Sequence, residues 1–205
     1  MIKIIDYGMG NSGSVGNMLL KLGGDFDIAT TPEQLEGASL IILPGVGAFD
    51  NGVNKLKERG YDVAIQVAVR NPALKFLGIC LGMQLLFNRS EEGTTEGLKL
   101  IPGEVVKFRP TSTDVKIPHM GWNQARQVRQ GTLLDGVFEG ARFYFVHSYH
   151  VFCDDEWVVC KTTHGYEFPS VVSKDNVYGA QFHPEKSHRF GLELLKRFVA
   201  GTHGK

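Results

Sequence analysis

The sequence predicts a single α/β domain with a central, mostly parallel sheet, helices on both faces and an antiparallel C-terminal extension. The first ninety residues alternate short apolar runs with helical patterns, which is the rhythm of parallel strands joined by helices. From about residue 105 the apolar runs are separated by turn residues instead, as in hairpin strands. The length of 205 residues and hydrophobic fraction of 42% suit one domain, which we expect over residues 1–200, with a flexible tail at 201–205.

Each element follows from a local pattern. β-branched and apolar runs predict buried strands, and apolar residues at helical spacing predict helices. The strands expected in the first half are Ile2–Asp6, Phe26–Ala29, Leu40–Leu43 and Leu74–Ile79. The helical segments expected there are Ser12–Leu22, a short one opening at Pro32 after the cap Thr31, Tyr61–Arg70 and Met83–Phe87. The second half is expected to hold strands at Phe143–Val146, Trp157–Val159, Val171–Val172 and Val177–Phe182, followed by a helix at Ser187–Ala200.

Charge and cysteine content exclude several classes of protein. Lysine plus arginine equals aspartate plus glutamate at 22 each, so no global field attracts nucleic acid or an anionic membrane. No apolar run approaches the roughly 18 residues of a membrane span, and the first residues do not resemble a signal peptide. Three cysteines are too few, and odd in number, for a disulfide framework. We therefore expect a cytoplasmic protein whose function depends on a local site.

The segment Gly78–Gly82 predicts a nucleophile at the end of a strand. It has the pattern G-x-C-x-G between an apolar strand and a helical run, which is the setting of a nucleophile elbow. Cys80 would then lie above a helix N-terminus, where free N–H groups and the helix dipole favour the thiolate. The Leu81 N–H would face a developing oxyanion. The alternative is a buried structural cysteine between two glycines that allow close packing.

A histidine and a glutamate later in the chain complete a candidate triad. His183 ends the strand expected at Val177–Phe182, at the edge of the sheet where sites gather in parallel-sheet proteins. Pro184 favours extended geometry at His183, and residues two apart in an extended segment project to the same side. Glu185 could therefore hold one imidazole nitrogen while the other serves Cys80. Alternatively, His183 is a loop histidine beside a solvated glutamate.

A glycine-rich loop, Leu43–Phe49, offers the second half of an oxyanion site. It follows the third expected strand, which neighbours the elbow strand in any doubly wound order. Its backbone N–H groups are free of strand pairing and could turn toward a developing negative charge. The same residues are equally consistent with a simple turn.

These motifs resemble a known family. Gly78–Gln84 followed by Ala180–Glu185 is similar to the class I (triad) glutamine amidotransferases, which release ammonia from glutamine for a partner enzyme. Four further segments are specific to a smaller group within this class. They resemble the glutaminase subunits of imidazole glycerol phosphate synthases, which act in histidine biosynthesis. These segments are Asp6–Asn11, Leu43–Phe49, Ile117–Asn123 and Tyr144–Tyr149. The resemblance covers about residues 2 to 199 in matching order.

The resemblance implies a role for each matching residue. Cys80 would form a γ-glutamyl thioester, His183 would act as base and then acid, and Glu185 would orient it. The Val46 N–H would be an oxyanion donor that rotates into place once the partner is loaded with substrate, because flanking glycines make such a rotation cheap. The positions that match glutamine-binding residues are Gly47, Gln84, Glu92, Ser148 and Tyr149.

Two of these glutamine-binding positions also make physical sense. Glu92 is a carboxylate suited to the α-ammonium of glutamine, and Gln84 lies one helical turn past Cys80, on the side of the elbow. A solvated Glu91–Glu92 pair is the alternative for that segment.

The resemblance also implies a partner, a (β/α)8 barrel that closes over the glutaminase as a heterodimer and receives the ammonia. Asn11, Trp122 and Asn123 match contact positions of that interface, although Trp122 could equally pack under a loop. No cofactor or metal is implied.

Residues 150–153 depart from the family pattern, which leaves open a paralogous glutaminase that supplies a sugar-aminating partner. A free-standing γ-glutamyl hydrolase also fits the Cys–His pair.

Two other classes of site fit less well. The segment Gly8–Gly13 matches the dinucleotide fingerprint G-x-G-x-x-G, but the confirming acid at the end of the second strand is absent, since Asp25 and Asp27 fall at its beginning. A metal site is not supported, because the histidines show no tight ligand spacing with cysteine or acids. We expect His119 and His147 to be wall or hydrogen-bonding residues, and Cys153 and Cys160 to be inert strand residues.

Overall fold

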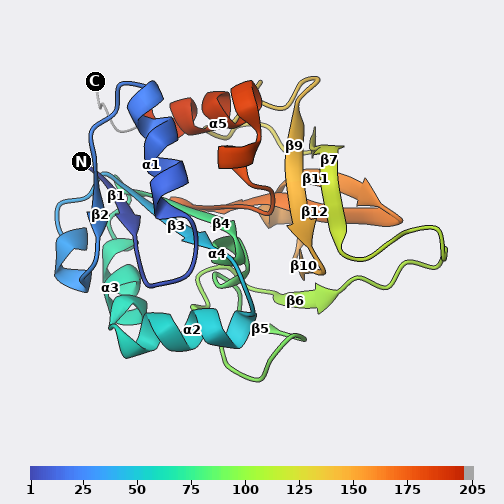
Figure 1. The fold of residues 1–205 in the computed structure, drawn as a ribbon, viewed down its shortest axis with the longest axis horizontal. Coiled ribbons are helices and arrows are strands. Elements are labelled where there is room, and N and C mark those ends of the chain that lie inside the picture. The colour runs from blue at the N-terminus through green and yellow to red at the C-terminus, as the bar shows by residue number, and fades with distance from the viewer. Residues whose placement is uncertain (201–205) are drawn as a thin grey trace.

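A large twisted sheet runs through the middle of the molecule (Figure 1). The computed structural model describes residues 1–200, so the tail expected at 201–205 lies outside the described residues. The strands, in their order across the sheet, are β2 (Phe26–Ala29), β1 (Ile2–Ile5), β3 (Leu40–Gly45), β4 (Lys75–Cys80), β13 (Val177–Ala180), β12 (Tyr166–Lys174), β11 (Val158–His164) and β8 (Arg126–Gln127). Neighbours from β2 to β13 pair parallel, and those from β13 to β8 pair antiparallel. The mostly parallel sheet with an antiparallel extension is confirmed.

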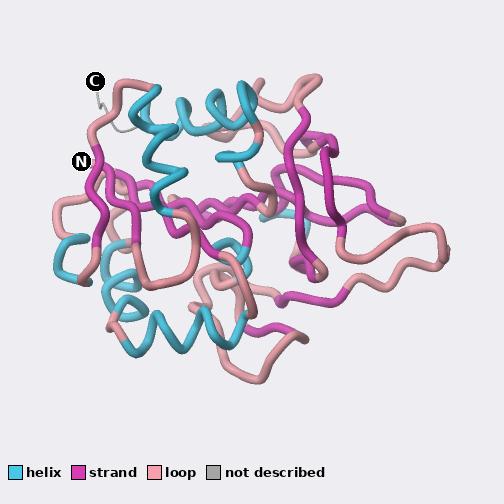
Figure 2. The backbone as a smooth tube through the Cα atoms, in the orientation of Figure 1, coloured by secondary structure: helices cyan, strands magenta, loops and turns pink. Residues whose placement is uncertain are grey.

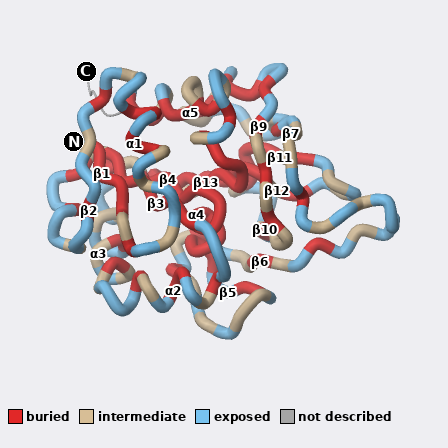
Figure 3. Tube along the Cα trace, in the orientation of Figure 1, coloured by how far each residue is buried: buried red, intermediate tan, exposed pale blue. Residues whose placement is uncertain are grey.

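Helices cover both faces of this sheet (Figure 2). One face carries α1 (Ser12–Lys21) and α5 (His188–Ala200), and the other carries α2 (Phe49–Glu58) and α3 (Tyr61–Ala68) (Figure 1). Side chains of a strand alternate between these faces: Ile42 packs in the core under α1 and α5, whereas Ile41 and Leu43 pack in the core over α2 and α3. Because both faces are buried (Figure 3), the central strands are mostly apolar, with Lys3 in β1 as an exception inside a strand.

Two smaller sheets stand beside the carboxyl ends of the parallel strands. One is formed by β10 (Tyr149–Phe152), β6 (Glu104–Lys107) and β5 (Arg89–Ser90), and the other by β7 (His119–Gln124) and β9 (Arg142–His147). A backbone bridge between Tyr144 and His183 ties β9 to the segment that follows β13. The fold thereby brings residues from both halves of the chain to the end of β4. No helix among residues 1–200 is long and apolar enough to cross a membrane.

Several element boundaries differ from those expected. Helix α2 was not predicted, and the helical run expected at Met83–Phe87 is the single turn α4 (Leu81–Gln84). Strand β3 continues through Pro44 and Gly45, which lie opposite Ile79 and Cys80. The helical segment after Thr31 is the 3₁₀ turn η1 (Pro32–Leu35), and a second 3₁₀ turn, η2, spans Asp155–Trp157.

Strand β13 ends at Ala180, before the expected end at Phe182. The Gln181 N–H still bonds the Ser170 carbonyl of the neighbouring strand β12 at 2.9 Å, and the chain leaves the sheet after this residue. The His183 N–H bonds the Tyr144 carbonyl of β9 at 2.9 Å instead. His183 is therefore held beside β9 rather than within the large sheet.

Candidate active site

The bend at the end of β4 requires glycine on both sides of Cys80. Cys80 has φ 56° and ψ −112°, a conformation that residues with a side chain rarely adopt, and it is the residue from which α4 starts. A Cβ on Gly78 would lie 2.5 Å from the Gly82 carbonyl oxygen, and a Cβ on Gly82 would collide with the Leu43 carbonyl. The sequence pattern G-x-C-x-G thus reflects a strained turn that only glycines can flank.

His183 and Glu185 form a buried pair next to this bend. Nδ1 of His183 lies 2.7 Å from Oε1 of Glu185, and the two side chains are 3% and 7% exposed. Within residues 1–200, the buried Nε2 atom of His183 has no hydrogen-bond partner. Burial lowers the pKa of His183, but the Cys80 sulfur and the Glu185 carboxylate outweigh it and raise that pKa to about 10.

The local geometry of this pair differs from the extended segment that we expected. His183 itself is extended, with φ −99° and ψ 98°, but Pro184–Lys186 forms the 3₁₀ turn η3. The hydroxyl of Ser187 donates to the His183 carbonyl at 2.6 Å and so closes the turn. The contact between imidazole and carboxylate therefore comes from a tight turn, and the expected same-side projection along an extended segment was wrong.

A cavity of about 400 Å³ opens above Cys80. Its walls come from the loop after β3, from α4, from the segment near Glu92, from the ends of β7 and β9, and from the segment after β13. The lining residues are Val46, Gly47, Cys80, Leu81, Gln84, Glu92, Pro118, Val146, His147, Ser148, Tyr149 and His183. Every residue expected to bind glutamine or the oxyanion lies on this surface, together with two of the three residues of the candidate triad. Their individual roles stay predictions.

The glycine-rich loop after β3 is held close to the bend. Gly45 lies opposite Cys80 in the pairing of β3 with β4, and Gly47 has φ 107°. Gly10, with φ 112°, lies so close that its Cβ would be 2.9 Å from the Pro44 carbonyl carbon and oxygen. Gly10 therefore serves close packing against this loop, which accounts for this glycine of the dinucleotide-like pattern without a nucleotide.

Glu92 has a structural contact in addition to its place in the cavity. Its Oε2 accepts a hydrogen bond of 2.8 Å from the Phe49 N–H at the start of α2. Ala48, at the N-cap of that helix, has no capping side chain, so Glu92 supplies the cap from a distant segment. A carboxylate has a second oxygen, and that oxygen is the one suited to a ligand ammonium.

Gln181, which the sequence patterns did not indicate, connects two of the site residues. Gln181 is fully buried, accepts a hydrogen bond of 3.0 Å from Gln84 Nε2, and donates to Cys80 Sγ at 3.8 Å. Its position follows from the pairing of Ala180 with Ile79, which places the next residue of each strand side by side. The sequence could have indicated Gln181 because this residue directly follows a strand that neighbours the strand ending at Cys80.

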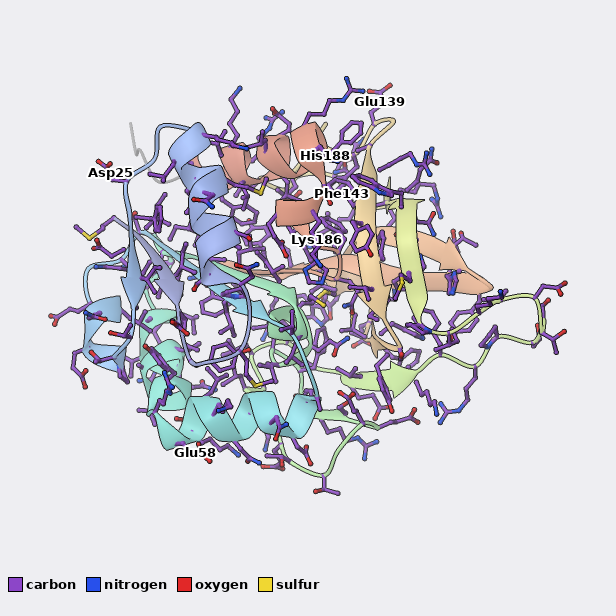
Figure 4. All side chains as sticks on the ribbon, viewed as in Figure 1. Asp25, Glu58, Glu139, Phe143, Lys186 and His188 are labelled. Atoms are coloured by element: carbon purple, nitrogen blue, oxygen red, sulfur yellow. The ribbon has the colours of Figure 1, made fainter. Side chains whose placement is uncertain are left out.

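The residues expected at a partner interface lie away from the cavity walls. Asn11 is exposed and caps α1, since its Oδ1 accepts from the Ser14 N–H at 2.9 Å. Trp122 is 38% exposed and stacks on His188, with ring centroids 5.3 Å apart and planes 5° apart; Figure 4 labels His188 at the start of α5. Asn123 instead turns inward, where its amide bonds His119 and the Thr163 carbonyl. Partner contact stays a prediction for all three.

The remaining histidines and cysteines do not form a metal site in the described part of the chain, where no group of three potential ligands is arranged to hold a metal ion. His119 and His147 are buried and hydrogen-bonded to each other, as expected of wall residues. Burial raises the pKa of Cys160 far above its usual range and that of Cys153 to about 12, which favours the unreactive thiol at both positions. Cys153 lies just beyond β10 rather than in a strand.

Comparisons with known proteins agree with this geometry. The family model for class-I glutamine amidotransferases matches residues 3–201. The chain is 51% identical to imidazole glycerol phosphate synthase subunit HisH 2 of Methanococcus maripaludis, over 97% of this chain and 98% of that protein. It is 49% identical to subunit HisH of Moorella thermoacetica, over 96% of this chain and 93% of that protein.

Solved structures share the fold at low sequence identity. A glutamine amidotransferase crystal structure superposes with a TM-score of 0.74 at 17% identity and covers 99% of both chains. PurLQS from Thermotoga maritima superposes with a TM-score of 0.74 at 20% identity and covers 97% of both chains. The family model and the similarity to the HisH subunits span nearly the whole sequence, and the chain therefore belongs to the class I glutamine amidotransferase family.

Proposed function

We propose that this chain is the glutaminase subunit of an imidazole glycerol phosphate synthase and hydrolyses glutamine through a Cys80 thioester. The observation that carries the proposal is the shared cavity, in which Cys80 and His183 lie together with Glu92, Ser148 and Tyr149. The similarity to HisH subunits over nearly the whole chain supports the same function. Hydrolysis is the reaction of this chain, and the lyase step of the synthase belongs to the partner.

In the first half of the reaction, Cys80 Sγ attacks the side-chain amide carbon of glutamine. The raised pKa of His183 makes its imidazole a good acceptor for the Cys80 proton, so His183 Nε2 takes this proton as the sulfur attacks. The carbonyl oxygen becomes an oxyanion within reach of the Leu81 N–H and, after rotation of the loop, the Val46 and Gly47 peptides. The C–N bond then breaks, and His183 gives its proton to the departing nitrogen, which leaves as ammonia.

In the second half, water replaces ammonia at the thioester. His183 Nε2, now neutral, takes a proton from water, and the resulting hydroxide attacks the carbonyl carbon. The C–S bond breaks, glutamate leaves, and Cys80 and His183 recover their starting proton count. Glu185 does not exchange a proton in this scheme, because its task is to orient the imidazole and stabilise its charged form.

The glutamine is held by groups at the two ends of the cavity. Glu92 binds the α-ammonium, and the backbone and side chains of Ser148 and Tyr149 face the rest of the amino acid. Gln84 and Gly47 complete the wall near the amide. Because most of these groups lie on loops between elements, small shifts of one loop alter the alignment of the amide with the sulfur.

The proposal includes a (β/α)8-barrel synthase subunit that receives the ammonia in a heterodimer, and a cytoplasmic location. The exposed aromatic ring of Trp122 supports a contact surface on β7. The three cysteines are free thiols, as in a reducing compartment.

A Cys80→Ala variant tests the function. In the complex with the barrel subunit, we expect glutamine-dependent synthesis of imidazole glycerol phosphate to be abolished, while synthesis from added ammonia continues at the wild-type rate. Glutamine turnover that survives the substitution would overturn the assignment of the nucleophile. Brisk glutamine hydrolysis by the isolated wild-type chain would favour a free-standing γ-glutamyl hydrolase, and activity only with a sugar-aminating partner would favour the paralogue.

A further inference from the structure

Two buried histidines face each other behind the wall of the cavity. His119 on β7 lies directly opposite His147 on β9, and the two residues are 3% and 7% exposed. His147 lines the cavity, and the next two residues of the chain, Ser148 and Tyr149, are those proposed to bind glutamine. Apolar side chains normally fill such a buried cross-strand position, since a polar group there costs free energy unless it is hydrogen-bonded.

The hydrogen bonds of this pair have only one consistent direction. A backbone carbonyl can only accept, so Nδ1 of His147 must donate to the Tyr149 oxygen at 2.8 Å. Burial holds the pKa of His147 well below its usual range, so its Nε2 is an acceptor at neutral pH. Nδ1 of His119, 3.0 Å away, must therefore donate to it.

The directed hydrogen bonds continue from His119 to Asn123. Burial and the neighbouring His164 lower the pKa of His119 to about 4, so His119 is neutral and its Nε2 accepts. Asn123 Nδ2 donates to that nitrogen at 3.1 Å, and its second hydrogen goes to the Thr163 carbonyl at 2.9 Å. Asn123 Oδ1 accepts the Gln124 N–H at 2.8 Å, which fixes the orientation of the amide.

Beyond Tyr149, the hydrogen bonds continue to the catalytic sulfur. The Tyr149 carbonyl that accepts from His147 also accepts from Gln84 Nε2 at 3.1 Å. Gln84 in turn donates to Gln181 at 3.0 Å, and Gln181 donates to Cys80 Sγ at 3.8 Å. One backbone oxygen therefore joins the histidine pair to the side chains around the reacting amide.

We propose that Asn123, His119 and His147 are positioning residues for glutamine binding, whose directed hydrogen bonds hold the Tyr149 carbonyl and, through it, Gln84 at the wall of the cavity. This inference rests on the proposed function. It also assigns Asn123 a role inside the protein, whereas Trp122, its neighbour on β7, faces outward.

Imidazole ¹⁵N spectra of the full chain at neutral pH test the direction of these bonds without any activity. We expect His119 and His147 both to carry their proton on Nδ1, with the signals assigned by single His→Phe variants. A proton on Nε2 of either residue with a bare Nδ1, or an imidazolium at either position, would overturn the proposal.

Steady-state kinetics of the complex with the barrel subunit test the positioning role. For His119→Phe we expect KM for glutamine to rise about three- to tenfold, the size of one lost hydrogen bond, while kcat stays within about twofold. His119→Asn keeps a donor near the position of Nδ1 and should restore most of the KM. His164→Phe is the matched control, because His164 stacks on His119 at 4.2 Å yet lies outside the hydrogen-bonded chain; its KM should not change.

Asn123→Leu provides a second variant if His119→Phe does not fold, since Asn123 is only partly buried. It should raise KM in the same direction as His119→Phe. An unchanged KM in Asn123→Leu and in every His119 variant that folds, or an equal rise in His164→Phe, would refute the positioning role. A wild-type complex without glutaminase activity would instead refute the proposed function, and the tautomers would still be measurable.

Discussion

Nδ1 of His183 lies 2.7 Å from Oε1 of Glu185 in a turn that excludes solvent from both groups. Oε2 of the same carboxylate is buried and has no hydrogen-bond partner among the described residues. The imidazole is therefore the hydrogen-bond partner of this carboxylate, and burial leaves their attraction with little screening. This arrangement holds the ring with Nε2 available to the cavity, which is the orientation that the proposed proton transfers need.

Replacing the two members of this pair should have unequal effects. In Glu185→Gln the ring loses its orienting charge but keeps its nitrogen, so we expect kcat for glutamine hydrolysis to fall roughly 10²-fold, against roughly 10⁴-fold for His183→Gln. Initial rates at saturating glutamine in the complex measure both. Synthesis from added ammonia is the internal control and should be unchanged. Equal and total loss in the two variants would contradict this division of roles.

The raised pKa of His183 predicts a pH dependence of stability. The pKa is about 10 in the folded protein and 6.5 for an unperturbed histidine, so the folded state binds the proton more tightly. The stability that this proton contributes is fully present below pH 6.5 and is lost as the pH rises toward 10. Urea unfolding of the wild type and of His183→Gln should therefore show a difference in free energy that shrinks across this interval. A difference that grows with pH would show that the pKa is not raised.

The parallel half of the fold was largely predictable because its signals are local. Leu40–Leu43 is apolar at every position and Ile2–Ile5 at every position but Lys3, which identifies strands buried on both faces. The glycines around Cys80 mark a turn that other residues cannot make. The elements placed by such signals agree with the structure to within a few residues.

The errors arose where distant contacts decide the local structure. Helix α2 starts with turn-forming residues, Asp50 and Asn51, and its N-terminus is capped by Glu92 from a separate segment. Asn123 lies on an exposed strand, and only the position of His119 and Thr163 shows that its side chain turns inward. Gln181 is likewise a site residue only because β13 pairs with β4.

Gly82 should tolerate no side chain. A Cβ at this position would meet the Leu43 carbonyl, which belongs to a central strand and cannot move aside. We expect Gly82→Ala to lower the free energy of unfolding by about 2 kcal/mol or more. Gly13→Ala is the matched control: its Cβ would lie 3.9 Å from Asn11 Oδ1, an ordinary van der Waals contact, and helix α1 should gain up to about 1 kcal/mol. Denaturant unfolding measures both, and a Gly82→Ala variant as stable as the wild type would contradict the tight packing at the bend.

Glu92 should affect glutamine binding more than turnover. Its carboxylate lines the cavity and is proposed to pair with the α-ammonium, so Glu92→Gln should raise KM for glutamine on the order of ten- to hundredfold, with a smaller effect on kcat. Glu91→Gln is the control, because Glu91 is exposed and pairs with Arg109 at 2.9 Å. Similar KM values for the two variants would show that Glu92 does no more than cap α2.

Trp122 should anchor the barrel subunit. Its ring is 38% exposed and is held flat against His188, so little side-chain entropy is lost when a partner covers it. We expect Trp122→Ala to weaken the association at least about tenfold, as for an aromatic residue at the centre of an interface. Phe152→Ala is the matched control, since Phe152 is 63% exposed on β10, a different sheet. Titration calorimetry of each variant with the barrel subunit gives the affinities. If the two variants bind the barrel subunit with equal affinity, Trp122 contributes no more than an exposed aromatic ring on another sheet, and the interface lies elsewhere.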